Sequence, residues 1–215
     1  MTDSIKALVF DFDGTLADSM MMVLPVYNQV AARLKLPLMT EADVPTLRRL
    51  GPLKAIEAYN VPLWKVPILL TEVRRELEKT GQIPALFSGL TDVFTAPSLA
   101  QIPRMILSSN SKMNILRFLD VHSLGTFDHL DCGASLFGKA RRLRRLLQVK
   151  HLSPKNVLYV GDEIRDIEAS REVGAKSVAV SWGYAERDML VAHGPNYLVD
   201  TPAELGQLFA ELIGK

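Results

Sequence analysis

The chain has little cysteine, little net charge and no long apolar run. Cys132 is its only cysteine, so no disulfide can form within the chain, and a reducing compartment is expected. Lys and Arg number 25 against 24 Asp and Glu, which gives no overall reason to expect nucleic acid as a partner. No apolar run reaches the ~18 residues that span a bilayer, and Asp11 and Asp13 interrupt the run that a signal peptide would need. These absences favour a cytoplasmic protein without a membrane partner.

Apolar segments recur along most of the chain, with helical stretches between them. Six segments read as strands: residues 6–10, 104–108, 128–131, 157–161, 176–181 and 197–199. Their continuous Val, Ile and Leu runs are typical of strands that are buried on both faces. Because strands and helices alternate, we predict an α/β fold with a parallel sheet covered on both faces.

Residues 17–83 break this alternation, because helical patterns recur there without a convincing strand. Pro25 lies inside the first helical stretch and is predicted to kink or divide it. Pro67 is predicted to lie in the first turn of a helix that runs to about Lys79, with Gly81 near its end. We therefore predict an all-helical insert between the first strand and the next.

Two carboxylates stand where the first predicted strand ends. Asp11 and Asp13 directly follow the apolar residues 7–10. Alternate residues of a strand point to the same side, so both side chains are expected to face one site. Adjacent anions are costly to bury unless a cation lies between them or they share a proton. A divalent metal with oxygen ligands would meet that requirement.

Three further motifs follow in chain order. Ser109 lies in a polar turn after the second predicted strand, and Lys139 opens a basic helical stretch. Asp162 and Asp166 form a GDxxxD motif at the end of another apolar strand. Together with the DFDGTLADS stretch near the N-terminus, these motifs resemble the haloacid dehalogenase-like (HAD) hydrolase superfamily, in particular its phosphoglycolate phosphatase-like branch. The resemblance covers nearly the whole chain.

The resemblance implies a Rossmann-like parallel sheet core with an inserted small α-helical cap domain. The core would comprise residues 1–16 and 84–215, and the cap residues 17–83. Open α/β sheets bind ligands at the carboxyl ends of their strands, so a cap joined there could close over a substrate and exclude water. Arg48 and Arg49 are candidate cap contacts to a substrate anion, although a solvated helix end is the simpler interpretation.

The resemblance also implies catalytic roles for the first motif. Asp11 would be the nucleophile that forms an aspartyl-phosphate, which divides one difficult step into two. Asp13 would be the general acid and base, a role typically worth about 10²–10⁴ in rate. Because the dehalogenase branch usually lacks this second Asp, its presence points to phosphate rather than carbon–halogen chemistry. Gly14 would permit the sharp turn that follows, and Thr15 would support the loop through its hydroxyl.

The second and third motifs would bind the phosphoryl group. The Ser109 hydroxyl and the backbone amides of Asn110 and Ser111 would hold phosphate oxygens at a helix start. An ordinary helix N-cap is the alternative interpretation of this serine-rich turn. Lys139 would neutralise charge on the nucleophile and on the phosphoryl group. Ser109, Asn110 and Lys139 are therefore the expected substrate-binding residues.

Mg²⁺ is the expected cofactor. The carboxylates of Asp11 and Asp162 and the backbone carbonyl of Asp13 would supply its protein ligands. Asp166, one helical turn after Asp162, would bind a metal-bound water or hold the motif lysine. Glu163 could serve as a charge at a helix N-terminus or as an outer group of the metal site, and the former is favoured.

These expectations combine into a Mg²⁺-dependent phosphatase acting on a small phosphorylated metabolite, with phosphoglycolate as the first candidate. One alternative is a phosphosugar mutase of the same superfamily, which would use the same residues. Two others are a phospho-accepting receiver domain and a non-catalytic binding protein that kept the fold. The helical insert and the GDxxxD motif argue against a receiver. Both a monomer and a homodimer are compatible with the sequence.

Overall fold

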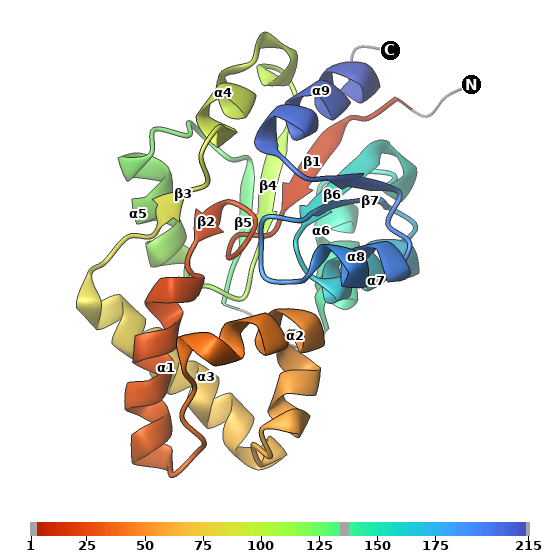
Figure 1. Ribbon diagram of the computed structural model, residues 1–215. Coiled ribbons are helices and arrows are strands. Elements are labelled where there is room, and N and C mark those ends of the chain that lie inside the picture. The colour runs from red at the N-terminus through yellow and green to blue at the C-terminus, as the bar shows by residue number, and fades with distance from the viewer. Residues whose placement is uncertain (1–3, 134–137, 214–215) are drawn as a thin grey trace.

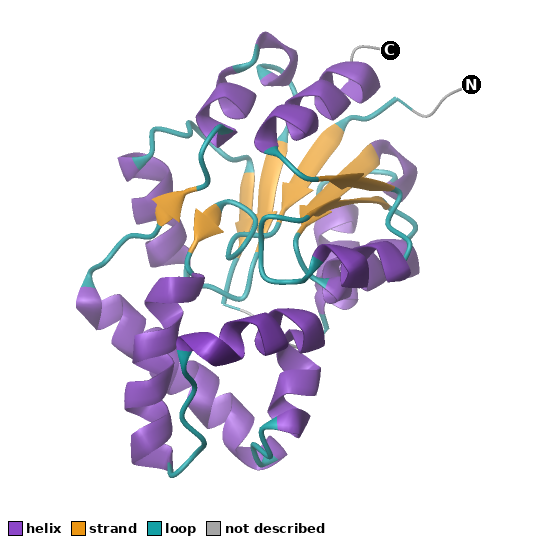
Figure 2. Cartoon of the chain, viewed as in Figure 1, coloured by secondary structure: helices purple, strands orange, loops and turns teal. Residues whose placement is uncertain are grey.

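The computed structural model describes residues 4–133 and 138–213, in which a six-stranded parallel sheet lies above three helices (Figures 1 and 2). The strand order is β5-β4-β1-β6-β7-β8. The strands are β1 (Ala7–Phe10), β4 (Arg104–Leu107), β5 (His129–Asp131), β6 (Val157–Gly161), β7 (Lys176–Val180) and β8 (Tyr197–Val199). All six predicted strands are confirmed, each to within one residue at either end. The predicted α/β fold with a parallel sheet is therefore confirmed.

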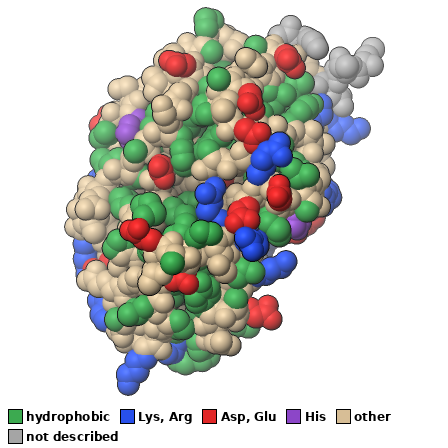
Figure 3. All heavy atoms as spheres, viewed as in Figure 1, with side chains coloured by type: hydrophobic (Ala, Val, Ile, Leu, Met, Phe, Trp, Pro, Cys, Tyr) green, Lys and Arg blue, Asp and Glu red, His purple; other side chains and the backbone are tan. Residues whose placement is uncertain are grey.

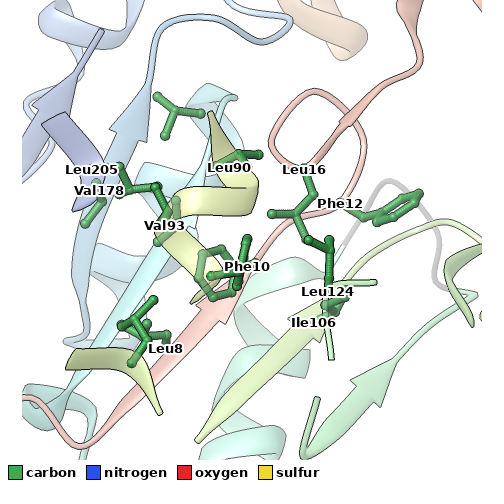
Figure 4. Close-up of a cluster of buried hydrophobic side chains, with 14 of the residues drawn as sticks. Leu8, Phe10, Phe12, Leu16, Leu90, Val93, Ile106, Leu124, Val178 and Leu205 are labelled. Atoms are coloured by element: carbon green, nitrogen blue, oxygen red, sulfur yellow. The ribbon is translucent and has the colours of Figure 1, made fainter. Parts of the chain in front are cut away.

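Helices cover both faces of this sheet. They are α4 (Leu90–Thr95), α5 (Lys112–Val121), α6 (Lys139–Val149), α7 (Ile164–Val173), α8 (Arg187–Ala192) and α9 (Pro202–Ile213). Successive residues of the fully buried β1 point to opposite faces, as a pleated strand requires. Leu8 and Phe10 pack with side chains from α4, α5 and α9 (Figure 4), whereas Ala7 and Val9 pack with leucines of α6. Continuous apolar strands therefore give two separate cores.

The remaining long helices form a group of their own beyond the carboxyl ends of the strands (Figure 1). They are α1 (Met20–Leu34), α2 (Val44–Ala58) and α3 (Val66–Thr80), and we call them the cap. The cap has its own cluster of buried side chains: Val30, Ala31, Leu36, Val61, Val66 and Leu69. Short 3₁₀ turns precede α2 (Glu41–Asp43) and α3 (Leu63–Lys65), and two more lie in the core (Pro97–Leu99 and Pro154–Asn156).

Prolines act differently in two of the cap helices. Pro25 lies inside α1, which nevertheless runs as one undivided helix, so the predicted division does not occur. Pro25 is exposed, and water can satisfy the carbonyl that its missing N–H leaves unpaired. Pro67 lies in the first turn of α3, and Gly81 ends that helix with a φ of 63°, as predicted.

The sequence missed one small antiparallel pair. β2 (Ala17–Asp18) and β3 (Ala85–Leu86) pair where the chain enters and leaves the cap. Residues 17–83 are therefore not entirely helical, because β2 lies at their start. Two residues are too short to show a strand period, and their pairing depends on bringing the two crossings together in space.

The near-equal numbers of acidic and basic residues are reflected on the surface. On the face shown in Figure 3, acidic and basic side chains are interspersed rather than grouped by sign. None of the helices in the described part of the chain has both the length and the apolar character that crossing a membrane requires.

Candidate active site

The four sequence motifs meet at the carboxyl edge of the sheet. Asp11 follows β1, and Ser109 and Asp162 lie just beyond the two strands that flank it, β4 and β6. Lys139 begins α6, which packs beneath the same strands. This edge is where parallel α/β sheets hold their ligands, because the loops after neighbouring strands converge there. The structure therefore brings together residues that are up to 155 positions apart, as the span from Asp11 to Asp166 shows.

Lys139 lies between two buried carboxylates. Its Nζ donates hydrogen bonds to Asp11 Oδ2 at 2.6 Å and to Asp166 Oδ1. The three side chains are between 2% and 9% exposed. Burial lowers the pKa of Lys139, but the charges of Asp11 and Asp166 outweigh it and raise the pKa above the usual value. The lysine is therefore a fixed cation against Asp11, and of the two functions predicted for Asp166, holding this lysine is the one that the geometry shows.

Among the described residues, the donors that hold the Asp162 carboxylate are all neutral. Thr15 Oγ1 donates to Asp162 Oδ1 at 2.6 Å, and the Tyr184 amide donates to Oδ2 at 2.7 Å. Burial and then the charges of Glu163 and Asp11 raise the pKa of Asp162 well above its usual range. No cation among the described residues forms an ion pair with it. Its ionised form therefore needs a positive charge that these residues do not supply.

Glycines make room for this carboxylate. Gly14 has a φ of +79°, and a Cβ at that position would lie 2.1 Å from Asp162 Oδ2. A Cβ on Gly183 would lie 2.2 Å from Asp162 Cβ and 2.3 Å from the Gly14 carbonyl oxygen. Only glycine allows the two loops to close around the Asp162 side chain this tightly.

Asp13 lines the cavity that reaches into the cap. Its Oδ1 accepts a hydrogen bond from Ser19 Oγ at 2.7 Å, and its Oδ2 accepts one from Asn110 Nδ2 at 3.0 Å. Burial raises the pKa of Asp13 to about 6, although these two hydrogen bonds lower it and the nearby Asp11 raises it further. A carboxyl group with such a pKa can both give and take a proton near neutral pH.

The turn after β4 is organised differently from the prediction. The Asn110 amide donates to Ser108 Oγ at 2.9 Å, and the Ser111 amide donates to Asn110 Oδ1 at 2.7 Å. Both amides that were expected to hold phosphate therefore already have acceptors. Ser111, rather than Ser108 or Ser109, is the N-cap of α5. Ser109 lines a cavity together with Asp13, as a phosphate-binding hydroxyl must.

The donor set fits a divalent metal. Carboxylate oxygens of Asp11, Asp162 and Asp166 lie within 4.8 Å of one another. In the described part of the chain, five acidic groups surround this point against two cations, Lys139 and Arg165. The acidic groups are Asp11, Asp13, Asp162, Glu163 and Asp166. Buried carboxylates in such excess, with oxygen donors only, match the chemistry of Mg²⁺. Of these three carboxylates, Asp162 is the one that does not pair with Lys139, which makes it the carboxylate best suited to the metal.

The sequence predicted the helix N-terminal role of Glu163 but did not identify Arg165 as a residue of the site. Glu163 is the N-cap of α7 and forms a capping box with Asp166, in agreement with the favoured helix N-terminal role. Arg165 Nε lies 2.5 Å from Glu163 Oε2, and Arg165 also lines the cavity beside Ser109. The position of Arg165 in the sequence could have indicated this role, because it lies inside the GDxxxD motif, three residues after Asp162, on a helix that starts at the site.

Other arginines divide between the cavity and the cap–core contact. Arg74 of α3 lines the cavity and donates to the Ser109 carbonyl at 2.5 Å. Arg48 Nε donates to the Tyr184 carbonyl at 3.3 Å, and Arg49 pairs with Glu186 at 3.3 Å. Arg48 and Arg49 therefore hold α2 against the core and do not line the cavity, which makes them poor candidates for substrate contacts.

Comparison with known proteins agrees with this geometry. A family model described as haloacid dehalogenase-like hydrolase matches residues 8–180. The chain is 35% identical over 210 residues to a phosphoglycolate phosphatase from Synechococcus elongatus, covering 97% of this chain and 99% of that protein. A phosphoglycolate phosphatase from Chromobacterium violaceum is 27% identical over 220 residues, covering 95% of this chain and 96% of that protein.

Solved structures show the same fold. A haloacid dehalogenase-like family hydrolase from Streptococcus pneumoniae matches with a TM-score of 0.77 and 24% identity, covering 97% of this chain and all of that one. A protein from Clostridium acetobutylicum, described as a predicted phosphatase, matches with a TM-score of 0.82 and 20% identity over 97% of this chain. At these identities the two structures bear on the fold alone.

Proposed function

Because the chain belongs to the haloacid dehalogenase-like hydrolase family and is a phosphatase, we propose that it hydrolyses small organic phosphomonoesters through a phosphorylated Asp11. The observation that carries this proposal is the buried contact between Asp11 and Lys139, 2.6 Å long. The contact holds one oxygen of the Asp11 carboxylate in place beside the cation. It also provides a positive charge where negative charge develops on the phosphoryl group.

In the first step, an oxygen of Asp11 attacks phosphorus and the bond between phosphorus and the ester oxygen breaks. The leaving alkoxide takes a proton from Asp13, which lies two residues away and faces the cavity. Asn110 and Ser19 orient the Asp13 carboxyl group through their hydrogen bonds. The products of this step are an alcohol and an aspartyl-phosphate.

In the second step, Asp13 takes a proton from a water molecule as that water attacks the phosphorus of the aspartyl-phosphate. The bond between phosphorus and Asp11 breaks, which restores the Asp11 carboxylate and releases inorganic phosphate. The Ser109 hydroxyl is available to hold a phosphoryl oxygen in both steps. Proton transfer by a positioned group of this kind is typically worth about 10²–10⁴ in rate.

We assign Mg²⁺ to Asp11, Asp162 and the Asp13 carbonyl. When bound, the ion supplies positive charge that offsets the anionic phosphoryl group beside the carboxylates. The support from this chain is the Asp162 carboxylate, whose donors in the described part of the chain are all neutral. Thr15 and the Tyr184 amide fix the direction in which Asp162 presents its oxygens, and Gly14 allows its close approach.

Phosphoglycolate is the first substrate to test, since a phosphoglycolate phosphatase is 35% identical to nearly the whole chain. The test of the mechanism is chemical trapping of the intermediate. Incubation with a labelled aryl phosphate followed by an acid quench should leave label on the wild-type protein and on Asp92→Asn, in which the altered residue is exposed on α4. Asp11→Asn should carry no label, because an amide is a poor nucleophile, and should lose on the order of 10⁴-fold or more in turnover. Label on Asp11→Asn at the wild-type level would refute the mechanism.

A further inference from the structure

A cavity leads from the catalytic residues into the cap. It begins at Asp13, Ser109 and Asn110 and continues between α1, α2 and α3. Its volume is about 340 Å³, within the range of pockets that bind small molecules. At roughly 30 Å³ for each water-sized atom, this space holds roughly ten non-hydrogen atoms beyond the phosphoryl group. Phosphoglycolate carries about half as many non-hydrogen atoms beyond its phosphoryl group, namely the ester oxygen, two carbons and two carboxylate oxygens.

Almost the whole inner wall of the cavity is apolar. Side chains of all three cap helices contribute to it, among them Val23, Leu24, Leu47, Ile56, Leu69 and Val73. Tyr27 also lines the wall, but its hydroxyl is turned to the Pro37 carbonyl at 2.9 Å, so it offers the cavity mainly its ring.

The polar side chains lie at the catalytic end. Arg74 and Arg165 line this end, and each is tied to a neighbour, the Ser109 carbonyl and Glu163 respectively. Two cations beside the phosphoryl site favour a dianionic phosphate there. A second anionic group placed deeper would lie among apolar side chains without a partner, which is costly.

Resting on the proposed phosphatase function, we propose that this enzyme selects phosphomonoesters whose organic part is an apolar group of about eight to ten carbons. The phosphate would lie against Asp11 and Ser109, and the apolar group would fill the cavity between the cap helices. Each methylene moved from water into such a pocket contributes about 0.8 kcal/mol, or roughly a fourfold gain in binding. That gain is made in the ground and transition states alike, so it raises kcat/KM.

The test is a series of primary alkyl phosphates from ethyl to decyl, measured by phosphate release below their critical micelle concentrations. We expect kcat/KM to rise with each methylene, by at least a hundredfold from ethyl to octyl phosphate, and octyl phosphate to exceed phosphoglycolate. A series that is flat within threefold, or a preference for phosphoglycolate over octyl phosphate, would overturn the proposal.

A variant that fills the cavity tests whether the apolar wall causes the dependence on chain length. Val73→Phe places a larger side chain in the apolar wall and should lower the ratio of octyl to ethyl phosphate at least tenfold. Ile68→Phe lies on the same helix, is 45% exposed and does not line the cavity, so its ratio should match the wild type. If Val73→Phe does not fold, inhibition of the wild-type enzyme by octylphosphonate and ethylphosphonate gives the same comparison. Octylphosphonate should bind at least tenfold more tightly, and equal inhibition would count against the proposal.

The two proposals fail in distinguishable ways. Turnover of 4-nitrophenyl phosphate that Asp11→Asn abolishes would support the catalytic proposal whatever the chain-length series shows. A flat series with that turnover intact would overturn only the apolar selectivity. Absence of phosphate release from every ester tested would overturn both.

Discussion

The sheet edge and the cap differ in how tightly and with what kind of side chain they are packed. At the sheet edge, the polar side chains that carry the proposed chemistry are held by short contacts to several neighbours, as Asp162 and Lys139 are. In the cap, a cluster of six buried apolar residues borders a cavity of about 340 Å³, and a second cavity of about 320 Å³ lies between α2 and the core. A rigid site suits a reaction that needs fixed geometry, whereas a loosely filled apolar space suits selection by size and polarity.

Polar contacts join the two regions. Besides the β2–β3 pair, Arg74 of α3 donates to the Ser109 carbonyl, and Arg48 and Arg49 of α2 contact Tyr184 and Glu186 in the loop after β7. Tyr184 links both regions, because its amide also donates to Asp162 and its hydroxyl contacts Ser19. Changes at the sheet edge should therefore abolish chemistry on every substrate, whereas changes in the cap should alter the choice among substrates.

Metal removal should give the largest effect. Excess chelator should abolish turnover of every phosphomonoester, and Mg²⁺ should restore it, because the carboxylates at the sheet edge would otherwise repel the phosphate. Mg²⁺ should also raise the melting temperature of the wild type, since ligands that bind only the folded state stabilise it. Asp162→Asn should weaken this thermal shift. Full activity in excess chelator would contradict the assigned site.

Asp13→Asn should give the next largest effect. The amide keeps the shape of the side chain but cannot exchange a proton, so turnover should fall by about 10²–10⁴ on both small and large esters. Steady-state kinetics on 4-nitrophenyl phosphate and octyl phosphate would measure this, and Asp92→Asn is a matched control. A loss confined to one ester would mean that Asp13 acts in selectivity rather than in chemistry.

Gly183→Ala tests how closely the loops at the sheet edge pack around the Asp162 side chain. The added Cβ would meet the backbone of Gly14 and the Asp162 side chain, so we expect a loss of about 1–3 kcal/mol in unfolding free energy and weaker Mg²⁺ binding. Gly206→Ala is the control, because its Cβ would meet Val93 at an ordinary 3.6 Å within α9. Denaturant unfolding with and without Mg²⁺ separates the two variants. If Gly183→Ala and Gly206→Ala have equal unfolding free energies, the loops around Asp162 can shift to accommodate the added Cβ.

Arg49→Ala should give the smallest effect. Its pair with Glu186 is solvent-exposed and lies outside the cavity, and such pairs contribute about 0–1 kcal/mol. We expect kcat/KM to change by less than about threefold, and equally for an aryl phosphate and for octyl phosphate. A larger loss for the longer ester alone would mean that Arg49 contributes to the pocket after all.

Much of the sheet edge could be predicted because its signals are local. A strand buried on both faces reads as a continuous apolar run, and polar residues at its end stand out against that run. Asp11 and Asp13 were identified in this way, whereas the family resemblance selected Ser109 and Asp162. Helix boundaries such as Gly81 follow from backbone preferences of single residues. The family resemblance supplied the roles that spacing alone does not determine.

The contacts that hold these residues were not predictable in the same way. Thr15 and Asp162 are 147 residues apart, and Asn110 and Asp13 are 97 apart, so no local pattern indicates either hydrogen bond. The two amides expected to bind phosphate instead bond within their own turn, which depends on the rotamers of Ser108 and Asn110. Arg165 lies within a recognised motif, but its position in the cavity depends on how α7 meets the cap.

The sequence by itself determined the α/β class, the six strands, the motif residues and the helical character of most of residues 17–83. Periodicity and side-chain chemistry suffice for those, because each is expressed within a few neighbouring residues. Only the tertiary structure decided that Arg48 and Arg49 hold α2 to the core and that the three cap helices line an apolar cavity. A cavity is the space that several helices leave unfilled, so it depends on their relative placement rather than on any one segment.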